Sequence, residues 1–567
     1  MARIMPQEKA STANKAGASN PEADWLRGHS NVVALAIMLA GFLARLWTAS
    51  GTFLNADEAV HFRIANQTSL ALVYRASLTE SHPPLLYFVL HVVRVVGTSE
   101  LWLRLPSVIA GTIFCWILFR WLSRVAGELT GFAGLVLASL LPPSIRLSAE
   151  IRQYALMLVL LMAALYFLER ALDENSFGRM LASAICLDLG LLSHYSAFFF
   201  TAGLGVYGLM KVVSRPRPTA RIVALWGIVQ AGAVALILFL YETHLSRLGR
   251  GESRTVLQGW MSEFYLRHSY FQAGHDNPIL FILGHSFGVF QFVFGQLAVG
   301  DVAGVMFVIA MILLWRRSEN DPKSATHRQL AIFCVLLFAL ACGASLAHVY
   351  PYGGTRHGSF LMIPALTGVA FSIARLARER WMRGVTLALG MAAVCIAFGK
   401  EHQPYMTRED QSLRQMQNAM AFLRQNAKPQ TLIFTDYESN MILGYYLCAH
   451  EPFAVRVSSA QFETFSCGGY QVAAANRTTA TNFTPDVFLR LWPNFSAAYN
   501  VKPNEPVWIV QAGWNAQLPV ELRRLPSLHN LQFQRFGDNL KIFELTAADV
   551  QRAISSSGPM TGANESP

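Results

Sequence analysis

The chain has 567 residues, of which 53% are hydrophobic and only 14% are charged, and its mean hydropathy is +0.33. This apolar surface exceeds what one water-soluble core can bury, so the composition excludes a soluble globular protein and predicts one that uses lipid as a solvent. The formal net charge of +11 does not indicate nucleic-acid binding, because the basic residues fall in short clusters between apolar runs, as membrane topology requires.

Eleven apolar runs are long enough, or nearly so, to span a bilayer. The first follows a polar, charged tail and precedes no small-residue cleavage site, so we interpret it as a retained anchor rather than a signal peptide. Two further runs, 84–96 and 279–294, are short, carry polar side chains and are ambiguous. The eleven runs are 32–47, 105–122, 131–145, 154–168, 180–192, 196–209, 222–241, 297–315, 330–349, 360–373 and 385–398.

Five basic loops between these runs predict the orientation, because loops rich in Lys and Arg stay in the cytoplasm. All five basic loops lie on the same side of the membrane as the N-terminal tail only if neither ambiguous run crosses the membrane. We therefore predict that 84–96 and 279–294 are interfacial or re-entrant helices, that the N terminus is inside and that the C terminus is outside. The loops carry Arg120 and Arg124; Arg170 and Arg179; Lys211, Arg215, Arg217 and Arg221; Arg316, Arg317, Lys323 and Arg328; and Arg375, Arg378, Arg380 and Arg383.

Beyond residue 400 the pattern changes to short apolar strands separated by amphipathic stretches, which is typical of a small α/β domain. The predicted architecture is a mainly α polytopic membrane protein with about eleven transmembrane helices, interfacial helices in its external loops and this extracytoplasmic domain. Its expected parts are a cytoplasmic tail (1–30), a transmembrane domain (31–400), the α/β domain (401–555) and a disordered tail (556–567).

The seven cysteines divide between these parts. Five lie in apolar runs, where a thiol acts as a small hydrophobic group. Cys448 and Cys467 lie in the C-terminal third. They are either two free thiols or a disulfide, and the disulfide requires a compartment outside the cytoplasm.

The first external loop holds two adjacent carboxylates, Asp57 and Glu58, directly after the first span. A carboxylate that is partly desolvated at a membrane surface can act as a general base toward a hydroxyl. The alternative is helix capping, in which Asn55 or Asp57 caps a helix over 58–71 and Glu58 lies at the positive end of its dipole. The two roles are compatible, and the residues alone leave both open.

Two cationic side chains follow in the same loop. His82 lies beside Pro83 and Pro84, which force a turn. It could bind a phosphate or a metal, although a solvated turn residue is the simpler explanation when it is taken alone. Arg104 begins the next span, where snorkelling to lipid headgroups competes with a phosphate contact through its guanidinium fork.

The second external turn, over 148–156, is a dense polar cluster that runs into an apolar helix. Its Glu150 and Arg152 are two residues apart and therefore do not face each other on a helix. At least one of them needs a partner elsewhere, and a bound phosphate or an acceptor hydroxyl is a candidate. Gln153 and Tyr154 follow directly.

Three more external segments carry polar groups. A short turn holds His194, and the loop 350–358 combines two glycines with Arg356 and His357, close to Tyr352. Glycines let backbone amides approach an anion, and a plain turn gives no reason for the charged pair. The long loop from residue 242 carries enough ligands for a divalent metal but at no recognised spacing, so a metal is left open: His244, Glu252, Glu263, His268, His275 and Asp276.

Taken together, four short motifs in this order resemble the bacterial glycosyltransferase family 39 proteins. That family is related to the protein O-mannosyltransferases and to the aminoarabinose lipid A transferase, and it has the GT-C fold. The resemblance covers residues 32–400. Its motifs are Asp-Glu at 57–58, His-Pro-Pro-Leu at 82–85, Arg-Leu-Pro-Ser at 104–107 and Ser-Ala-Glu-Ile-Arg-Gln-Tyr-Ala-Leu at 148–156.

The resemblance implies that Asp57 is the catalytic base that deprotonates an acceptor hydroxyl, that Glu58 is its neighbour in the motif, and that Arg104 contacts the carrier phosphate. It also implies a polyprenyl-phosphate sugar donor, a lipid, glycan or protein acceptor, and inversion at the anomeric carbon. Ser81 and His82 stand where the aminoarabinose transferase has Glu-Lys before its proline, so a zinc site resting on that Glu is not carried over.

We therefore expect a hexosyl or pentosyl transferase of the inner membrane and cell envelope. A transporter or lipid flippase is the alternative, although inverted repeats and charges near the midplane are not seen in the sequence. A polymerase or ligase of surface polysaccharide would share the type of donor. The expected donor-phosphate contacts are Arg104, Arg152, Arg356 and His357, and the expected substrate contacts are His82, Glu150, Gln153, Tyr154, His194 and Tyr352.

Overall fold

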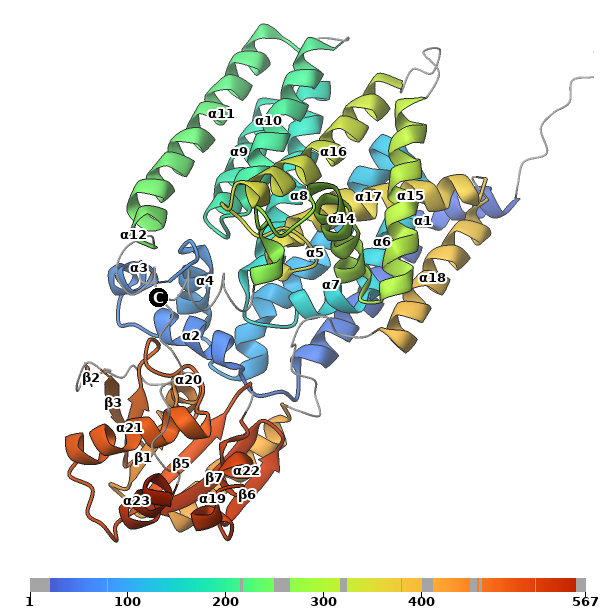
Figure 1. Cartoon of the computed structure of the whole chain (residues 1–567). Coiled ribbons are helices and arrows are strands. Elements are labelled where there is room, and N and C mark those ends of the chain that lie inside the picture. Colours follow the sequence, from blue (N-terminus) through green and yellow to red (C-terminus); the bar gives the residue numbers. More distant parts are fainter. Residues whose placement is uncertain are drawn as a thin grey trace, which may run out of the picture.

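A computed structural model describes residues 21–556, apart from 79, 215–217, 249–265, 317–323, 379, 400–410, 449–455, 458–460 and 515. A helical bundle forms one end of the molecule and a sheet domain forms the other (Figure 1). The first helix, α1 (Pro21–Ala49), begins within the segment predicted to be a tail. The rest of that tail and residues 557–567 lie outside the described residues.

All eleven predicted spans are helical. Within the described ranges, eight helices are long and apolar enough to cross a membrane. The other three predicted spans correspond to the shorter helices α6 (Glu128–Leu140), α9 (Phe177–Leu191) and α10 (Ala197–Val213). The eight long spans are formed by α1, α5 (Glu100–Ala126), α8 (Gln153–Glu174), α11 (Ala220–Leu240), α15 (Leu297–Trp315), α16 (Ser324–Leu346), α17 (Met362–Leu376) and α18 (Trp381–Phe398).

Loops that the charge rule assigns to one side of the membrane do lie together. At the site end, Leu85 N donates to Leu192 O at 3.0 Å, and loops at residues 57, 152 and 356 meet. At the opposite end, Arg124 pairs with Asp173 at 2.9 Å, and Thr219 N donates to Asn175 at 2.7 Å. These loops therefore lie on the sides that the alternation predicts, while the identity of the cytoplasmic side stays a prediction.

The two ambiguous runs form α4 (Leu85–Val93) and α14 (Pro278–Phe294). At about 1.5 Å per residue α4 is ~14 Å long, which is too short to cross a bilayer core of about 30 Å. Helix α14 is followed by α15, which leads away from the end of the bundle that holds Asp57. Arg356 therefore lies at the same end as Asp57, as predicted for an α14 that does not cross. Short segments complete this end: α2 (Ala56–Ala65), α3 (Leu70–Ser77), α7 (Pro142–Leu147), η1 (Tyr241–Leu245), α12 (Ser246–Leu248), η3 (Arg267–Ser269) and η4 (Arg356–Leu361).

The C-terminal region is a seven-stranded sheet in the order β2-β3-β4-β1-β5-β7-β6, with β1 parallel to β4 and β5 and the other pairs antiparallel. Successive strand residues point to opposite faces, so Ile433 packs under α19 and α20 while Phe434 packs under α21. The strands are β1 (Leu432–Thr435), β2 (Arg456–Val457), β3 (Phe462–Cys467), β4 (Tyr470–Ala475), β5 (Pro506–Ala512), β6 (Phe533–Gly537) and β7 (Leu540–Thr546). The helices are α19 (Leu413–Asn426), α20 (Tyr437–Leu447), α21 (Pro485–Ala498), α22 (Leu518–Leu522), η5 (Pro526–Leu528) and α23 (Ala547–Ser556).

Cys448 and Cys467 form a disulfide, with their Cα atoms 4.8 Å apart. It joins the end of α20 to the end of β3. Of the two alternatives that the sequence leaves open, the structure contains the disulfide.

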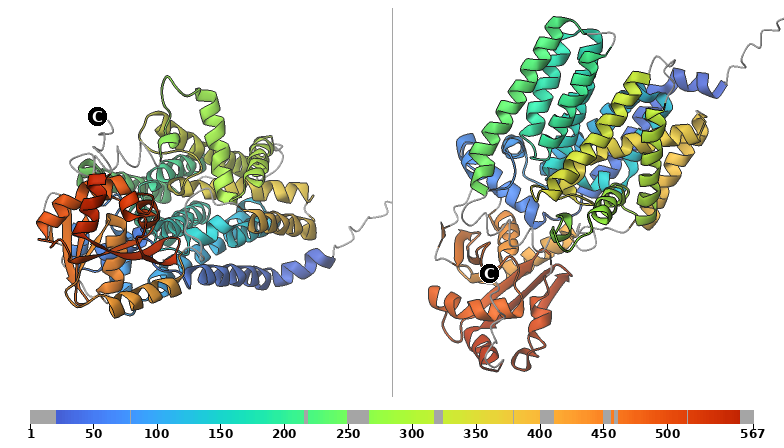
Figure 2. Two further views of the ribbon diagram at one scale, coloured as in Figure 1. Left: turned by 60° about the horizontal axis from the view of Figure 1, so that its bottom comes forward. Right: turned by 45° about the horizontal axis from the view of Figure 1, so that its top comes forward.

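The sheet domain is fixed to the external loops by a shared core. Phe62 on α2 lies in one hydrophobic cluster with Met441 and Tyr445 on α20. Tyr445 also donates to Thr98 O at 2.6 Å, and Tyr446 donates to Glu100 at 2.9 Å. Figure 1 and the right-hand view of Figure 2 place α2 to α4 between the bundle and the sheet. The junction is therefore a packed interface between the two parts.

Candidate functional site

Helix α2 carries the Asp-Glu pair, and its N terminus is closed by a capping box. The side chain of Asn55 accepts from Glu58 N at 2.9 Å, and Glu58 Oε2 accepts from Asn55 N at 3.1 Å. The capping role predicted as an alternative is thus filled by Asn55. Asp57, in the first turn of this helix, is left to contact other segments.

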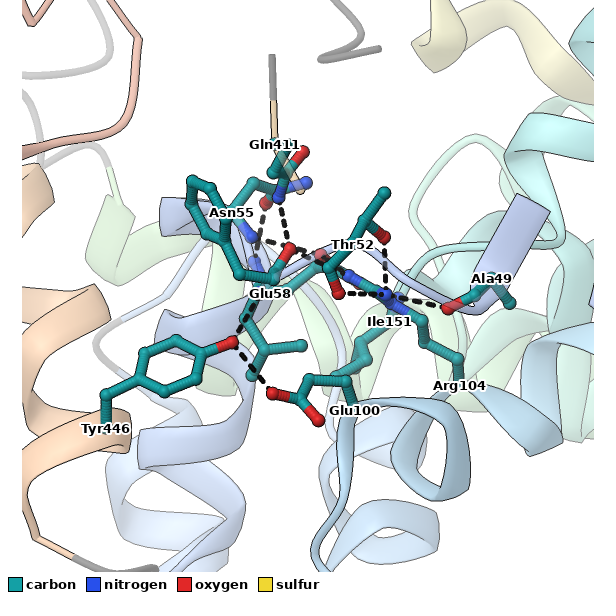
Figure 3. Close-up of polar contacts among 11 residues, drawn as sticks. Ala49, Thr52, Asn55, Glu58, Glu100, Arg104, Ile151, Gln411 and Tyr446 are labelled. Atoms are coloured by element: carbon teal, nitrogen blue, oxygen red, sulfur yellow. Dashed lines mark hydrogen bonds and ion pairs between the residues drawn. The ribbon is translucent and has the colours of Figure 1, made fainter. Parts of the chain in front are cut away.

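Glu58 is fully buried and binds Arg104 through two hydrogen bonds, of 2.7 Å from Nε and 2.6 Å from Nη2 (Figure 3). It also accepts from Ile151 N at 2.9 Å. The remaining guanidinium N–H groups of Arg104 donate to Ala49 O, Thr52 O, Thr52 Oγ1 and Phe53 O. This ion pair therefore ties α1, α2, α5 and the 148–152 turn together.

Asp57 makes a different pair of contacts. Its Oδ2 is bound by Arg152 and by Arg356, the latter at 3.0 Å from Nη2. Burial alone would raise the pKa of Asp57, but the two guanidinium charges outweigh it and lower this pKa to about 2. The side chain is 30% exposed, whereas that of Arg152 is 5% exposed. The result is one ionised carboxylate between two arginines.

Four histidine rings lie in a row that begins beside this cluster. The ring of His61 lies 5.7 Å from that of His82, His82 lies 5.5 Å from His194, and His194 lies 6.5 Å from His357. Burial, together with the charge of Arg152, lowers the pKa of His61 and of His194 to about 3. The pKa of His82 is also well below its ordinary value, because of burial and then His194. His61, His82 and His194 are therefore neutral near pH 7.

The polar turn at 148–156 lies beside the carboxylates. Burial and the nearby charge of Glu58 raise the pKa of Glu150 to about 7. Gln153 is fully buried, and neither of its amide atoms has a partner among the described residues. The ring of Tyr154 lies 5.2 Å from that of His194. Three of the predicted substrate contacts thus belong to the same neighbourhood as Asp57.

Several buried polar atoms around Asp57 have no hydrogen-bond partner within the described part of the chain. Leaving such an atom unsatisfied costs about 1 to 3 kcal/mol, so a polar group that meets these atoms would be stabilised. They are His61 Nδ1, His82 Nδ1, Tyr87 Oη, Arg152 Nε and Tyr195 Oη.

Comparison with known proteins identifies the architecture. Residues 81–242 match the family model described as dolichyl-phosphate-mannose-protein mannosyltransferase. The crystal structure of ArnT from Cupriavidus metallidurans bound to undecaprenyl phosphate superposes with a TM-score of 0.50 at 12% identity, covering 93% of this chain and 99% of that one. The chain therefore has the GT-C fold, and its residues 81–242 are similar to that mannosyltransferase family.

Two further solved structures are similar to this chain. ArnT from Cupriavidus metallidurans in the apo state has a TM-score of 0.49, 12% identity and the same coverage of both chains. The oligosaccharyltransferase AglB from Archaeoglobus fulgidus, in complex with an inhibitory peptide and a dolichol-phosphate, has a TM-score of 0.42 and 11% identity, over 72% of this chain and 62% of that chain. No curated protein sequence matches the chain significantly.

One contact expected from the sequence does not fit the geometry of the site. Arg104 was predicted to hold the donor phosphate, but it is 2% exposed and its N–H groups are bound by Glu58 and by backbone and side-chain oxygens. A guanidinium has five donors, and all of them are occupied. Its role in this structure is to brace the external loops.

The predicted substrate contact Tyr352 and the metal that was left open are not part of the cluster around Asp57. The hydroxyl of Tyr352 lies 2.7 Å from Ser286 Oγ on α14, and its backbone N donates to Ser269 O. Within the described ranges no group of three His, Cys, Asp or Glu side chains is arranged to hold a metal ion. Glu252 and Glu263, named as candidate ligands, lie outside the described residues.

Sequence reasoning missed His61 and Tyr87. His61 follows Asp57 by four residues on one helix and therefore lies on the same face, a signal that helical spacing does offer. Tyr87 lies on α4, with its ring 5.5 Å from that of His61. Its place in the site depends on how α4 packs against α2, which no local pattern indicates.

Proposed function

We propose that this protein transfers a sugar from a polyprenyl-phosphate donor to a hydroxyl of an acceptor outside the cytoplasm, with Asp57 as the general base. The observation that carries the proposal is the contact of one partly exposed carboxylate with Arg152 and Arg356. A base for the acceptor and cationic groups for a phosphate leaving group are the two elements that this reaction requires.

The arginines account for the leaving group. Planar guanidinium groups bind phosphate oxygens in a bidentate manner, so Arg152 and Arg356 are assigned to the donor phosphate. A bound phosphate competes with Asp57 for the same N–H groups. As their hold on Asp57 weakens, its pKa rises from the low value of the free enzyme, and the carboxylate becomes a stronger base.

The reaction then balances in one displacement. The acceptor hydroxyl gives its proton to Asp57 while its oxygen forms a bond to the anomeric carbon. The bond from that carbon to the phosphate oxygen breaks, and polyprenyl phosphate leaves with its charge against Arg152 and Arg356. Attack from the face opposite the leaving group inverts the configuration. The neutral ring N–H groups of His61, His82 and His194 add hydrogen-bond donors without adding charge.

The proposed location is the outer face of the inner membrane. The described parts of the basic loops lie together at the end of the bundle away from Asp57, in accordance with the positive-inside rule. The Cys448–Cys467 disulfide in the sheet domain is typical of an oxidising compartment. Both features support an extracytoplasmic site.

The test is turnover of a panel of hexose and pentose polyprenyl phosphates by the purified protein and by Asp57→Asn. Loss of a general base costs on the order of a hundredfold or more in rate, so we expect that loss of transfer at a temperature at which the thermal midpoint shows the variant to be folded. Asp538→Asn, which changes an exposed turn carboxylate of the sheet domain, is the matched control. Full transfer by Asp57→Asn would contradict the proposal, and lipid movement without sugar transfer would identify a flippase.

A further inference from the structure

The segment that joins α1 to α2, residues 50–55, is bound along its backbone by the first residues of the sheet domain. Leu413 N donates to Gly51 O at 2.8 Å, and Phe53 N donates to Gln411 O at 2.9 Å. We call residues 50–55 the α1–α2 segment. The sheet domain therefore holds the stretch of backbone that leads into the helix carrying the candidate base.

One side chain of the sheet domain reaches the same segment. The hydroxyl oxygen of Tyr446, on α20, accepts from Leu54 N at 3.1 Å, and the hydroxyl donates to Glu100 Oε1 at 2.9 Å (Figure 3). Leu54 is fully buried, so water cannot replace this acceptor if it is lost. The hydroxyl of Tyr446 therefore bridges the α1–α2 segment and the first turn of α5.

This bridge closes a ring of polar contacts around the N termini of α2 and α5. Asn55, the last residue of the α1–α2 segment, caps α2 through its contacts with Glu58. Glu58 binds Arg104, which follows Glu100 by about one turn of α5. Tyr446 completes the ring and is the member that belongs to the sheet domain (Figure 3).

The place of Asp57 depends on this ring, because Asp57 lies in the first turn of α2. Its Oδ2 contacts Arg152 and Arg356, which come from other parts of the bundle. Helix α2 has only 10 residues, so a shift at its N terminus changes the distance from Asp57 to both guanidinium groups. Misplacement of a catalytic group by about 1 Å can lower a rate by up to about a hundredfold.

The neighbouring tyrosine supports the junction in a different way. Tyr445 donates to Thr98 O at 2.6 Å, and its ring lies edge-on to that of Phe62 at 5.0 Å. Thr98 precedes α5, and Phe62 lies in the second half of α2. Both contacts therefore join the sheet domain to the bundle at places beyond the α1–α2 segment.

We propose that Tyr446 is a positioning residue, whose hydroxyl bridge sets the place of α2 and thereby of Asp57 relative to the two arginines. The inference rests on the proposed function, in which Asp57 is the base. It assigns to the sheet domain a part in the transfer step. Because the arginines of the bundle hold the donor phosphate, loss of the bridge slows transfer and leaves donor binding unchanged.

The experiment compares kcat, the donor KM and the binding of undecaprenyl phosphate among variants of the purified full chain. The donor is the hexose or pentose polyprenyl phosphate that the unmodified chain turns over fastest. Tyr446→Phe removes the bridging hydroxyl and keeps the ring. Glu100→Ala removes the acceptor of that hydroxyl, whereas Glu100→Gln keeps an amide oxygen that can accept from it. Tyr445→Phe is the matched control, because it removes a hydroxyl of the same junction.

We expect Tyr446→Phe to lower kcat about tenfold or more, with changes of less than about twofold in the donor KM and in undecaprenyl phosphate binding. Glu100→Ala should have the same effect, and Glu100→Gln should keep most of the rate. The double variant of Tyr446→Phe and Glu100→Ala should be no slower than the slower single variant, because both substitutions break one bridge. Tyr445→Phe should keep the kcat of the unmodified chain.

Equal losses of kcat in Tyr446→Phe and Tyr445→Phe would overturn the inference, because they would show a general weakening of the junction. An unchanged kcat in Tyr446→Phe, or a loss confined to donor binding, would also overturn it. Rates are compared at a temperature at which the thermal midpoint shows each variant to be folded. If Tyr446→Phe does not fold, the difference between Glu100→Ala and Glu100→Gln decides the outcome.

Failure of the proposed function has a different signature. Full transfer by Asp57→Asn would overturn the proposed base, and the role of Tyr446 in placing it would fall as well. Loss of transfer in Asp57→Asn together with a normal kcat in Tyr446→Phe would overturn only the positioning role.

Discussion

Asp57 and Glu58 are neighbours in sequence, but they contact different arginines. Glu58 is buried against Arg104, whereas Asp57 is partly exposed against Arg152 and Arg356. A buried ion pair with every donor satisfied has a structural role, because any ligand would have to displace those bonds. A partly exposed carboxylate has room for a substrate. Solvent access therefore distinguishes the structural role of Glu58 from the proposed catalytic role of Asp57.

Replacement of Arg104 tests the structural assignment. Arg104→Gln leaves the Glu58 carboxylate buried without its cation, which costs about 3 to 5 kcal/mol, so the thermal midpoint should fall markedly. The folded fraction should still bind undecaprenyl phosphate within about threefold of the unmodified chain. Arg124→Gln breaks an exposed pair worth at most about 1 kcal/mol and is the control. A selective loss of lipid-phosphate binding in Arg104→Gln would restore its predicted role at the donor.

The buried histidines predict how stability depends on pH. The pKa of His61 and of His194 is about 3 in the folded chain and about 6.5 when unfolded. Below pH 6.5 the unfolded chain binds protons that the folded chain does not, so stability is present above pH 6.5 and is lost progressively toward pH 3. The raised pKa of Glu150 acts in the opposite direction between about pH 7 and 4.5.

Burial also raises the pKa of Asp436 to about 6, so the histidines and the carboxyl groups act in opposite directions. The test therefore compares the dependence of the thermal midpoint on pH, from 7.5 to 4.5, in the unmodified chain and in His194→Asn. This variant keeps a hydrogen-bonding side chain toward Ser196 but cannot titrate, so it should lose less stability toward acid than the unmodified chain. An equal slope in the variant would show that His194 takes up its proton in the folded state.

At the scale of elements, α14 positions the loop that carries Arg356. A Cβ on Gly354 would lie 2.6 Å from Gly288 O on α14, and one on Gly300 in α15 would lie 2.4 Å from the Cα of Gln291. Real Cβ atoms do not approach so closely, so these glycines allow backbone contact between segments. The packing of α14 against its neighbours thus determines how far Arg356 extends toward Asp57.

Substitution of Gly354 tests that relation. Gly354→Ala should push the 350–358 loop away from α14, displace Arg356 and lower transfer about tenfold or more, because small misplacements of a catalytic group are costly. Gly284→Ala on the same helix meets no atom within 4 Å and should leave transfer unchanged. Transfer rates of the two variants, at equal thermal midpoints, provide the measurement. Normal activity in Gly354→Ala would show that the loop adapts.

At the scale of the whole molecule, one face of the bundle carries the polar loops and the sheet domain, and the other carries the basic loops. The shared core between α2 and α20 holds the sheet domain over Asp57. The disulfide closes that domain from within. The α/β domain thereby packs against the loops that carry the candidate site of the membrane bundle.

Cysteine labelling tests the orientation of this arrangement. Lys502→Cys places a thiol on the exposed surface of the sheet domain, and Arg316→Cys places one at the end of α15 among the basic loops. A membrane-impermeant maleimide should label the first in intact cells and the second only after lysis, because the domain is expected outside. Labelling of Arg316→Cys alone in intact cells would reverse the topology and with it the proposed location of the reaction.

Much of this molecule follows from local properties of the chain. The length of apolar runs and the charge of the loops predict the spans and the common side of Asp57, Arg152 and Arg356, because lipid insertion depends on these short segments. The alternation of strands and helices beyond residue 400 likewise predicts the α/β domain. The family resemblance adds the candidate role of Asp57.

Only the tertiary structure decided which arginine meets which carboxylate. Arg104 and Glu58 are 46 positions apart, and Arg356 and Asp57 are 299 apart. Such pairings depend on how helices pack, and a sequence read in short windows carries no measure of that packing. For the same reason the contact of α20 with α2 could not be predicted, since it joins a separate domain to the external loops.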